Sequence, residues 1–115
     1  LYEYHSAINT ADYDGAMGLL TPDFAAEIFP DERQWHGAYE TTYDDQLEVV
    51  EATRDGDQAR VRLRFRSQQE SGYGPKGARR ATCLWWDIDY RVELHDGEWL
   101  IDGASGHRDP AWTRC

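Results

Sequence analysis

A strand-like run near the end of the chain restricts the fold more than any other feature. From Cys83 to Leu94 every even-numbered position is apolar, and the odd-numbered positions from 87 onward are charged. An alternation of period two is typical of a β-strand with one buried face. Because an Asp96-Gly97 turn and a second apolar segment over residues 98–104 follow directly, the run predicts a β-hairpin whose interior residues can be assigned one by one.

The first part of the chain has the periodicity of helices. Residues 1–8 carry apolar side chains at helical spacing, and Asp12 and Thr21 stand at positions typical of helix caps. A fourth helix is predicted from Asp31 to about Tyr43. The period then changes to two, which predicts strands over residues 47–53, 59–67, 79–94 and 98–104. A long loop is predicted over residues 68–78. Helices followed by strands indicate an α+β fold, with N-terminal helices packed on one face of a strongly curved antiparallel sheet.

Length and charge exclude several classes of protein. The 115 residues suffice for one small domain, and the formal net charge is -10. Residues 1–58 hold fourteen acids against two arginines, a field that repels nucleic acid and anionic lipid. The chain has no long apolar run, and its first residue, Leu1, predicts a trimmed domain or mature form. We therefore expect attachment to a membrane only through a segment outside this chain.

The segment 59–67 predicts a charge ladder on the outer face of the sheet. Its apolar side chains point inward, so no polar group is expected on the inner face of this strand. The outward side chains are basic, and the carboxylates of the hairpin strand are expected to pair with them across the sheet. We prefer this structural interpretation to a nucleic-acid stripe. The predicted ladder consists of Arg60, Arg62, Arg64, Arg66, Asp87, Asp89 and Glu93.

Three short segments, taken in order, resemble a known family. They are residues 4–16 (YHSAINTADYDGA), 19–24 (LLTPDF) and 96–102 (DGEWLID), and they resemble the NTF2-like superfamily, which includes SnoaL-like and ketosteroid-isomerase-like domains. The resemblance covers residues 1–105 and implies a cone, in which helices close over a bent sheet and leave a pocket at the open end. Residues 106–115 would then be a C-terminal tail that packs on this domain.

The resemblance also implies what the pocket could contain. Enzymes of this superfamily typically carry an Asp or Glu base, sometimes with His, and a neutral donor for an oxyanion. Here the alternation directs the strand carboxylates outward, so we expect an aromatic pocket without an inward carboxylate. If the chain is an enzyme, the catalytic candidates are His5, Tyr39 and Tyr90; the alternative is that the aromatic side chains simply fill the core. The expected pocket residues are Tyr4, Ile8, Tyr13, Trp35, Tyr39, Trp86, Tyr90 and Trp99. No cofactor is expected, and no histidine pair has the spacing of a metal site.

The positions of the two cysteines suggest a disulfide between the hairpin and the tail. Cys83 opens the hairpin on its outward face and Cys115 ends the tail. If the tail folds back over the outer sheet, Trp112 can lie against Trp85 and the two sulfurs can form a disulfide, which indicates an oxidising, extracytoplasmic compartment. The alternative is two free thiols.

Three functions are consistent with these residues. The first is a non-catalytic ligand-binding or sensing module of a secreted or membrane-anchored bacterial protein, a role that the resemblance includes. The second is a small SnoaL-like isomerase, cyclase or hydrolase acting on an apolar substrate. The third is a structural domain that forms a homodimer through the outer sheet face, with Trp85 as the anchor. A cavity that holds an inward carboxylate or His beside a Tyr would favour the second function over the first.

Overall fold

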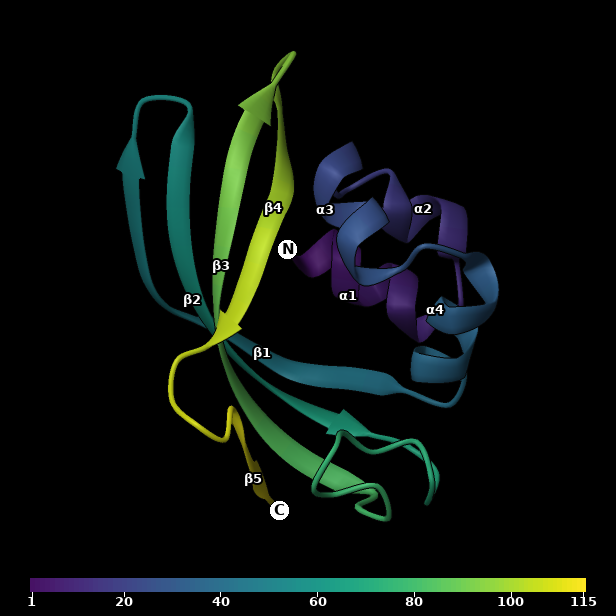
Figure 1. Cartoon of the computed structure of the whole chain (residues 1–115). Helices are drawn as coiled ribbons and strands as arrows, with labels where there is room; N and C mark the ends of the chain where they lie inside the picture. Colours follow the sequence, from purple (N-terminus) through teal and green to yellow (C-terminus); the bar gives the residue numbers. More distant parts are fainter.

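Four helices lie on one side of a bent antiparallel sheet (Figure 1). The computed structural model describes all residues from 1 to 115. None of its helices combines the length and the apolar character needed to cross a membrane. The elements in chain order are α1 (Tyr2–Asn9), α2 (Tyr13–Met17), α3 (Pro22–Ile28), α4 (Glu32–Tyr39), β1 (Tyr43–Asp55), β2 (Gln58–Gln68), β3 (Cys83–His95), β4 (Glu98–Gly106) and β5 (Trp112–Arg114). The α+β prediction is thereby confirmed.

The sheet has the strand order β1-β2-β3-β4, and every neighbouring pair is antiparallel. The strands β1, β2 and β3 bend sharply near their middle, and the helices cover the concave side (Figure 1). β4 pairs with β3 only from Ile88 to His95. The other half of β3 is left for β5, which pairs with Leu84, Trp85 and Trp86. The bend encloses a space between the helices and the lower half of the sheet.

Two helices begin at the caps that the sequence predicted, Asp12 and Thr21, and a third is capped by Asp31. The side chains of Asp12, Thr21 and Asp31 each accept a backbone N–H of the helix that follows, which satisfies an otherwise unpaired donor. Thr21 also joins the helical layer to the sheet, because its hydroxyl donates to Asp102 on β4 at 2.7 Å. Its N–H donates to the carbonyl of Ile101 at 2.9 Å.

The start of β1 differs from the prediction. The fourth helix ends at Tyr39 and the strand begins at Tyr43, ahead of the expected residue 47. A β-bulge follows at once: the register with β2 shifts between Asp45 and Glu48, and Gln46 has a φ of 57°. A bulge reverses which side chains face inward. As a result Asp44 lies opposite Ser67 on the concave face and is buried, although the alternation of the later part of the strand gives no sign of it.

The outer face carries only part of the predicted charge ladder. Arg62 pairs with Asp87, donating from Nε and Nη2 at 2.9 and 2.7 Å. The other two hairpin acids pair with histidines instead, Asp89 with His107 and Glu93 with His95. Arg66 takes its carboxylate from β1, because Asp45 lies directly opposite it in the register. Arg60 and Arg64 have no ion-pair partner, so the expected pairing of Asp89 and Glu93 with the arginines of β2 was wrong.

The tail extends the sheet rather than lying over its face. β5 joins the edge of β3 with Trp112 opposite Trp86 and Thr113 opposite Trp85, so the expected contact of Trp112 with Trp85 is replaced by a strand pairing. The backbone of Asp87 accepts from the N–H of His107 at 3.0 Å and donates to the carbonyl of Ala111 at 2.9 Å. These contacts bury Asp87 beneath the tail. At the end of the tail Cys83 and Cys115 are joined by the predicted disulfide.

The disulfide is expected to contribute substantially to stability. It links positions 32 residues apart, and a loop of this length favours the folded state by about 2–4 kcal/mol, because the crosslink restricts the unfolded chain. Replacement of Cys83 and Cys115 by serine should lower the free energy of unfolding by that amount in a urea titration. Reduced wild type should match the double variant, and equal midpoints for oxidised wild type and variant would contradict the expectation.

The ion pair under the tail should make stability depend on pH. Hydrogen bonds from Arg62 lower the pKa of Asp87 below its usual value, so the pair stabilises the fold above the unfolded aspartate pKa of about 3.9. This contribution is lost as the pH falls through the lower folded pKa. We expect Arg62→Gln to reduce the urea midpoint at pH 7 and to approach wild type in strong acid.

Arg64→Gln is the matched control for this titration, since Arg64 lies on the same face without an ion pair. It should behave like wild type at every pH. An Arg62→Gln deficit that stays constant between pH 7 and pH 2.5 would show that the loss is one of packing and not of charge.

Candidate functional site

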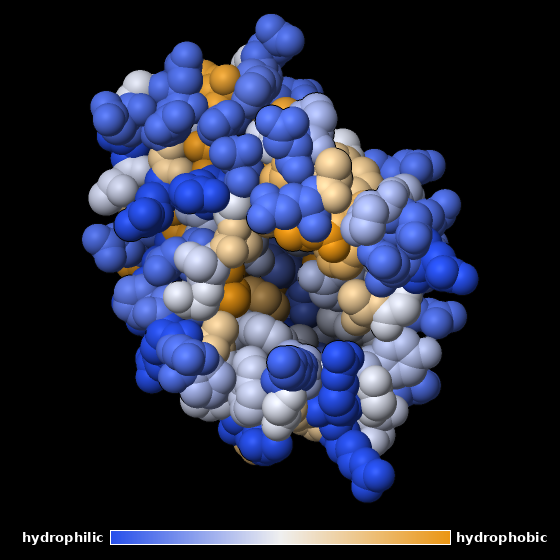
Figure 2. All heavy atoms as spheres, viewed as in Figure 1, coloured by the Kyte–Doolittle hydropathy of each residue, from blue (hydrophilic) through white to orange (hydrophobic).

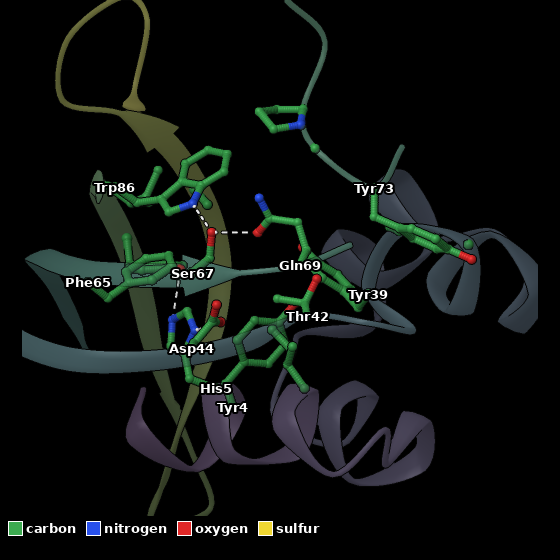
Figure 3. A pocket seen from close by; sticks show the side chains of 18 of the residues that line it. Tyr4, His5, Tyr39, Thr42, Asp44, Phe65, Ser67, Gln69, Tyr73 and Trp86 are labelled. Atoms are coloured by element: carbon green, nitrogen blue, oxygen red, sulfur yellow. Dashed lines mark hydrogen bonds and ion pairs between the residues drawn. The ribbon is translucent and has the colours of Figure 1, made fainter. Parts of the chain in front are cut away.

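An open cavity of about 350 Å³ lies between the helices and the lower half of the sheet. Figure 2 shows it as a hollow in the middle of one face, with apolar side chains along its rim. Its walls are mainly apolar and aromatic, and the side chains among them that can ionise are Asp44, His5, Arg79 and four tyrosines. Figure 3 shows how polar groups of the lining converge from α1, β1 and β2. A cavity of this size is large enough for a small organic molecule.

A histidine and a carboxylate meet at the floor of the cavity. The Nδ1 atom of His5, on α1, lies 2.7 Å from Oδ2 of Asp44, on β1. Both side chains are buried, with 3% of each exposed to solvent. A charged carboxylate is costly to bury without partners. The contact with His5 is therefore the interaction that allows Asp44 to occupy this position as a carboxylate.

The backbone of Asp44 is fixed by the same helix. The side chain of Asn9, one turn after His5, donates from Nδ2 to the carbonyl of Asp44 at 2.7 Å and accepts the N–H of Asp44 at 2.6 Å. This double hydrogen bond closes the start of β1 onto the end of α1. The carboxylate is thereby held in one orientation, as a functional group that must meet a ligand requires.

The tautomer of His5 follows from its two neighbours. On the far side of the ring, Nε2 lies 3.1 Å from the hydroxyl of Tyr90. Burial raises the pKa of Tyr90 well above its ordinary value, so the phenol keeps its proton and can donate a hydrogen bond to an unprotonated Nε2. Nδ1 then carries the ring proton and donates to Asp44, which can only accept. Both nitrogens of His5 are thus occupied.

One oxygen of Asp44 remains free. Oδ1 is buried and has no hydrogen-bond partner, while Oδ2 is held by His5. An unpaired carboxylate oxygen in a buried site is unfavourable unless something else occupies it. Asp44 lines the cavity, and Oδ1 is its one carboxylate oxygen without a partner.

Two further phenols stand around this carboxylate. Burial raises the pKa of Tyr39 to about 12, and the nearby charge of Asp44 adds to the shift. Burial likewise raises the pKa of Tyr4, to which Tyr39 and Tyr90 add smaller contributions. All three tyrosines therefore stay neutral at physiological pH and act as hydrogen-bond donors. The site combines one ionisable carboxylate with neutral donors in an apolar cavity.

Beside Asp44, on the same sheet, lies a polar network that is already satisfied. The hydroxyl of Ser67 accepts from Nε1 of Trp86 at 2.8 Å and donates to Oε1 of Gln69 at 2.9 Å (Figure 3). Gln69 in turn donates to the carbonyl of Ala81 at 2.7 Å. The expectation that the inner face of β2 has no polar group was wrong, because Ser67 shares the inward phase of the strand. The network positions the walls and leaves the free acceptor to Asp44.

The predicted pocket residues divide into two groups. Tyr4, Ile8, Tyr39, Trp86 and Tyr90 line the cavity together with His5. The other three do not line it. Tyr13 and Trp35 pack edge to face within the helical layer, with ring centroids 5.6 Å apart, and Trp35 is fully buried.

Trp99 lies elsewhere on the inner side of the sheet. It pairs with Leu94 at the far end of the β3–β4 hairpin, beyond the cover of the helices, and it is 37% exposed. The guanidinium of Arg54 lies 5.1 Å from its ring centroid. The alternation assigned the correct face to Trp99, but the face extends beyond the cavity.

Sequence reasoning missed Asp44 altogether. The expectation of a pocket without an inward carboxylate was wrong because the strand was started too late and because the bulge at Gln46 changes the phase. The only available signal was the pair Asp44-Asp45 between a helix and a strand, and it does not say which acid points inward. The structure brings no three His, Cys, Asp or Glu side chains together in a way that could hold a metal ion.

Comparison with known proteins identifies the fold. No family model matches the sequence, and no curated protein matches it either. Solved structures do match. A SEC-C motif protein from Rhodopseudomonas palustris has a TM-score of 0.66 at 17% identity, over 88% of this chain and 70% of that one.

Two further structures extend the comparison to proteins named as enzymes. A candidate polyketide cyclase from Pseudomonas putida has a TM-score of 0.56 at 14% identity, over 96% of this chain and 91% of that one. An LEH-like epoxide hydrolase from M. tuberculosis has a TM-score of 0.53 at 11% identity, over 88% and 71%. At such identities the likeness concerns the fold alone. Together with the helices closed over a bent sheet, these matches show that the chain has the NTF2-like cone fold.

Proposed function

We propose that this protein is a small acid–base enzyme that removes a proton next to a carbonyl group of a substrate with an apolar body. The observation that carries the proposal is the buried Asp44 in the lining of an apolar cavity, with one carboxylate oxygen held by His5 and the other without a hydrogen-bond partner. A base in such a place is shielded from water and fixed in direction. Both properties increase the rate of proton transfer.

The chemistry follows from the geometry of the side chains. Oδ1 of Asp44 accepts the proton, the electrons of the C–H bond form a C=C bond, and the carbonyl oxygen becomes an enolate oxygen. A neutral phenol, Tyr39 or Tyr4, donates a hydrogen bond to that oxygen. If the enolate is conjugated with a second C=C bond, return of the proton from Asp44 to a different carbon completes an isomerisation. In a cyclisation the enolate carbon attacks a second carbonyl of the same molecule, and the resulting alkoxide takes the proton back from Asp44.

His5 acts as a positioning residue in this scheme. Its Nδ1–H stabilises the ionised carboxylate before the transfer, and Tyr90 fixes the ring from the other side. That solved structures named as a polyketide cyclase and an epoxide hydrolase share the fold supports an enzyme on this scaffold. The substrate is not named by that likeness.

A non-catalytic ligand-binding or sensing module is the second candidate. The observation in its favour is that both nitrogens of His5 are already engaged, so this ring offers no free atom to a substrate. In either case we propose an oxidising, extracytoplasmic compartment, since the disulfide between Cys83 and Cys115 would be kept reduced in most cytosols.

The proposed base can be tested with a simple ketone. We expect the wild type to accelerate exchange of the acidic α-protons of 2-tetralone in deuterated water, followed by proton NMR. Asp44→Asn should lower the enzyme-dependent rate by about a hundredfold or more, because the amide cannot take up the proton. Tyr39→Phe should lower it by a smaller factor, since a second phenol remains.

Asp45→Asn is the matched control, as Asp45 is the adjacent residue of the same strand but faces outward to Arg66. It should exchange like wild type. If Asp44→Asn keeps the wild-type rate while it remains folded by circular dichroism, Asp44 is not the base. A wild type that binds apolar probes but exchanges no ketone would favour the sensing module.

A further inference from the structure

One cationic side chain lines the cavity, and it has no acidic partner. Arg79 lies in the loop between β2 and β3 at the mouth, and it is the only arginine or lysine among the lining residues. No carboxylate lies within ion-pair distance of its guanidinium. Its single hydrogen bond is a long one, from Nη1 to the carbonyl of Gly74 at 3.5 Å. Most of its five N–H donors are therefore free to bind a ligand.

The loop that carries Arg79 is folded in a defined way. The carbonyl of Arg79 accepts the N–H groups of Gly72 and Gly74, at 2.8 and 3.0 Å. A side chain at position 74 would collide with the carbonyl of Ala78, so the chain can only turn this tightly with glycine. Tyr73, at the same rim, donates to Glu40 at 3.3 Å. The backbone position from which the Arg79 side chain extends is thus fixed.

The negative and positive side chains of the cavity lie at opposite ends of it. The only acid in its lining, Asp44, is buried at the floor, and the only permanent cation is at the mouth. An anionic group would be repelled from the floor and attracted to the mouth. The planar guanidinium matches the two oxygens of a carboxylate, sulfonate or phosphate, which makes a charge-assisted pair stronger than a neutral hydrogen bond.

We infer that the ligand of this cavity is an amphipathic anion, with an apolar body inside and a carboxylate or similar oxyanion at the mouth, bound by Arg79. The inference rests on the cavity of the proposed function and adds the charge and orientation of the substrate. The net charge of -10 makes such a local cation necessary, because the protein as a whole repels anions. Arg79 is then a specificity residue, separate from the chemistry at Asp44.

A matched pair of fluorescent probes tests the inference. 8-Anilinonaphthalene-1-sulfonate carries an anionic sulfonate, and N-phenyl-1-naphthylamine has the same ring system without it. Wild type should bind the anionic probe more tightly than the neutral one. Arg79→Gln should weaken binding of the anionic probe by about three- to tenfold, as expected for loss of one partly exposed charge-assisted pair. Binding of the neutral probe should stay within about twofold.

Two control variants test whether the probes bind in this cavity. Arg80→Gln removes an adjacent exposed arginine that does not line the cavity and should leave both affinities unchanged. Val49→Glu introduces a charge into the separate apolar groove that Val49 forms with Trp99, and it should also leave both unchanged if the probes occupy the cavity.

Several results would overturn the inference. The first is an equal loss of affinity for both probes in Arg79→Gln, and the second is an unchanged affinity for the anionic probe. The third is failure of the wild type to bind either probe. A negative result for Arg79 with an intact effect of Asp44→Asn on ketone exchange would reject the anionic substrate and leave the proposed base standing. Selective loss of the anionic probe in Arg79→Gln, with no effect of Asp44→Asn on ketone exchange, would reject the base alone.

Discussion

Burial of the Asp44 carboxylate is the constraint around which the lower half of the cone is arranged. Asn9 binds the backbone of Asp44 in both directions and His5 binds one of its oxygens, so helix α1 and the start of β1 are joined at this residue. The bulge at Gln46 then allows Asp45, the next residue, to face Arg66 on the outer surface. Two adjacent acids thus serve opposite faces of the sheet, one in an apolar cavity and one in a surface ion pair.

The aromatic side chains are divided between a core and a cavity. Tyr13 and Trp35 fill the helical layer, whereas Tyr39 and Tyr90 line an open space in which their phenols stay protonated. A cone of this size needs both, because the packed part gives the rigidity on which the geometry of the open part depends. On the outer side, the tail and its disulfide hold the free half of β3, and the tail buries Asp87, the partner of Arg62.

Most of the fold could be predicted, and the reason differs between elements. The hairpin from Cys83 was readable because regular alternation assigns each face, and the helix starts at Asp12 and Thr21 were readable because a cap is a local interaction. The sequence analysis placed the start of β1 too late, because neither regular alternation nor a local cap marks Tyr43 as the first residue of a strand. The prediction of the site was the least accurate, because the carboxylate of Asp44 lies between the start of β1 and the bulge.

The sequence by itself determined the α+β class, the inward face of the regular strands and the helix caps at Asp12 and Thr21. These follow from side-chain periodicity and from contacts near in sequence. Only the tertiary structure decided that Asp44 points inward, that His5 lies between Asp44 and Tyr90, and that a cavity remains beside them. Those facts depend on one residue inserted into a strand and on contacts between segments 39 and 85 residues apart, and neither leaves a periodic signal in the sequence.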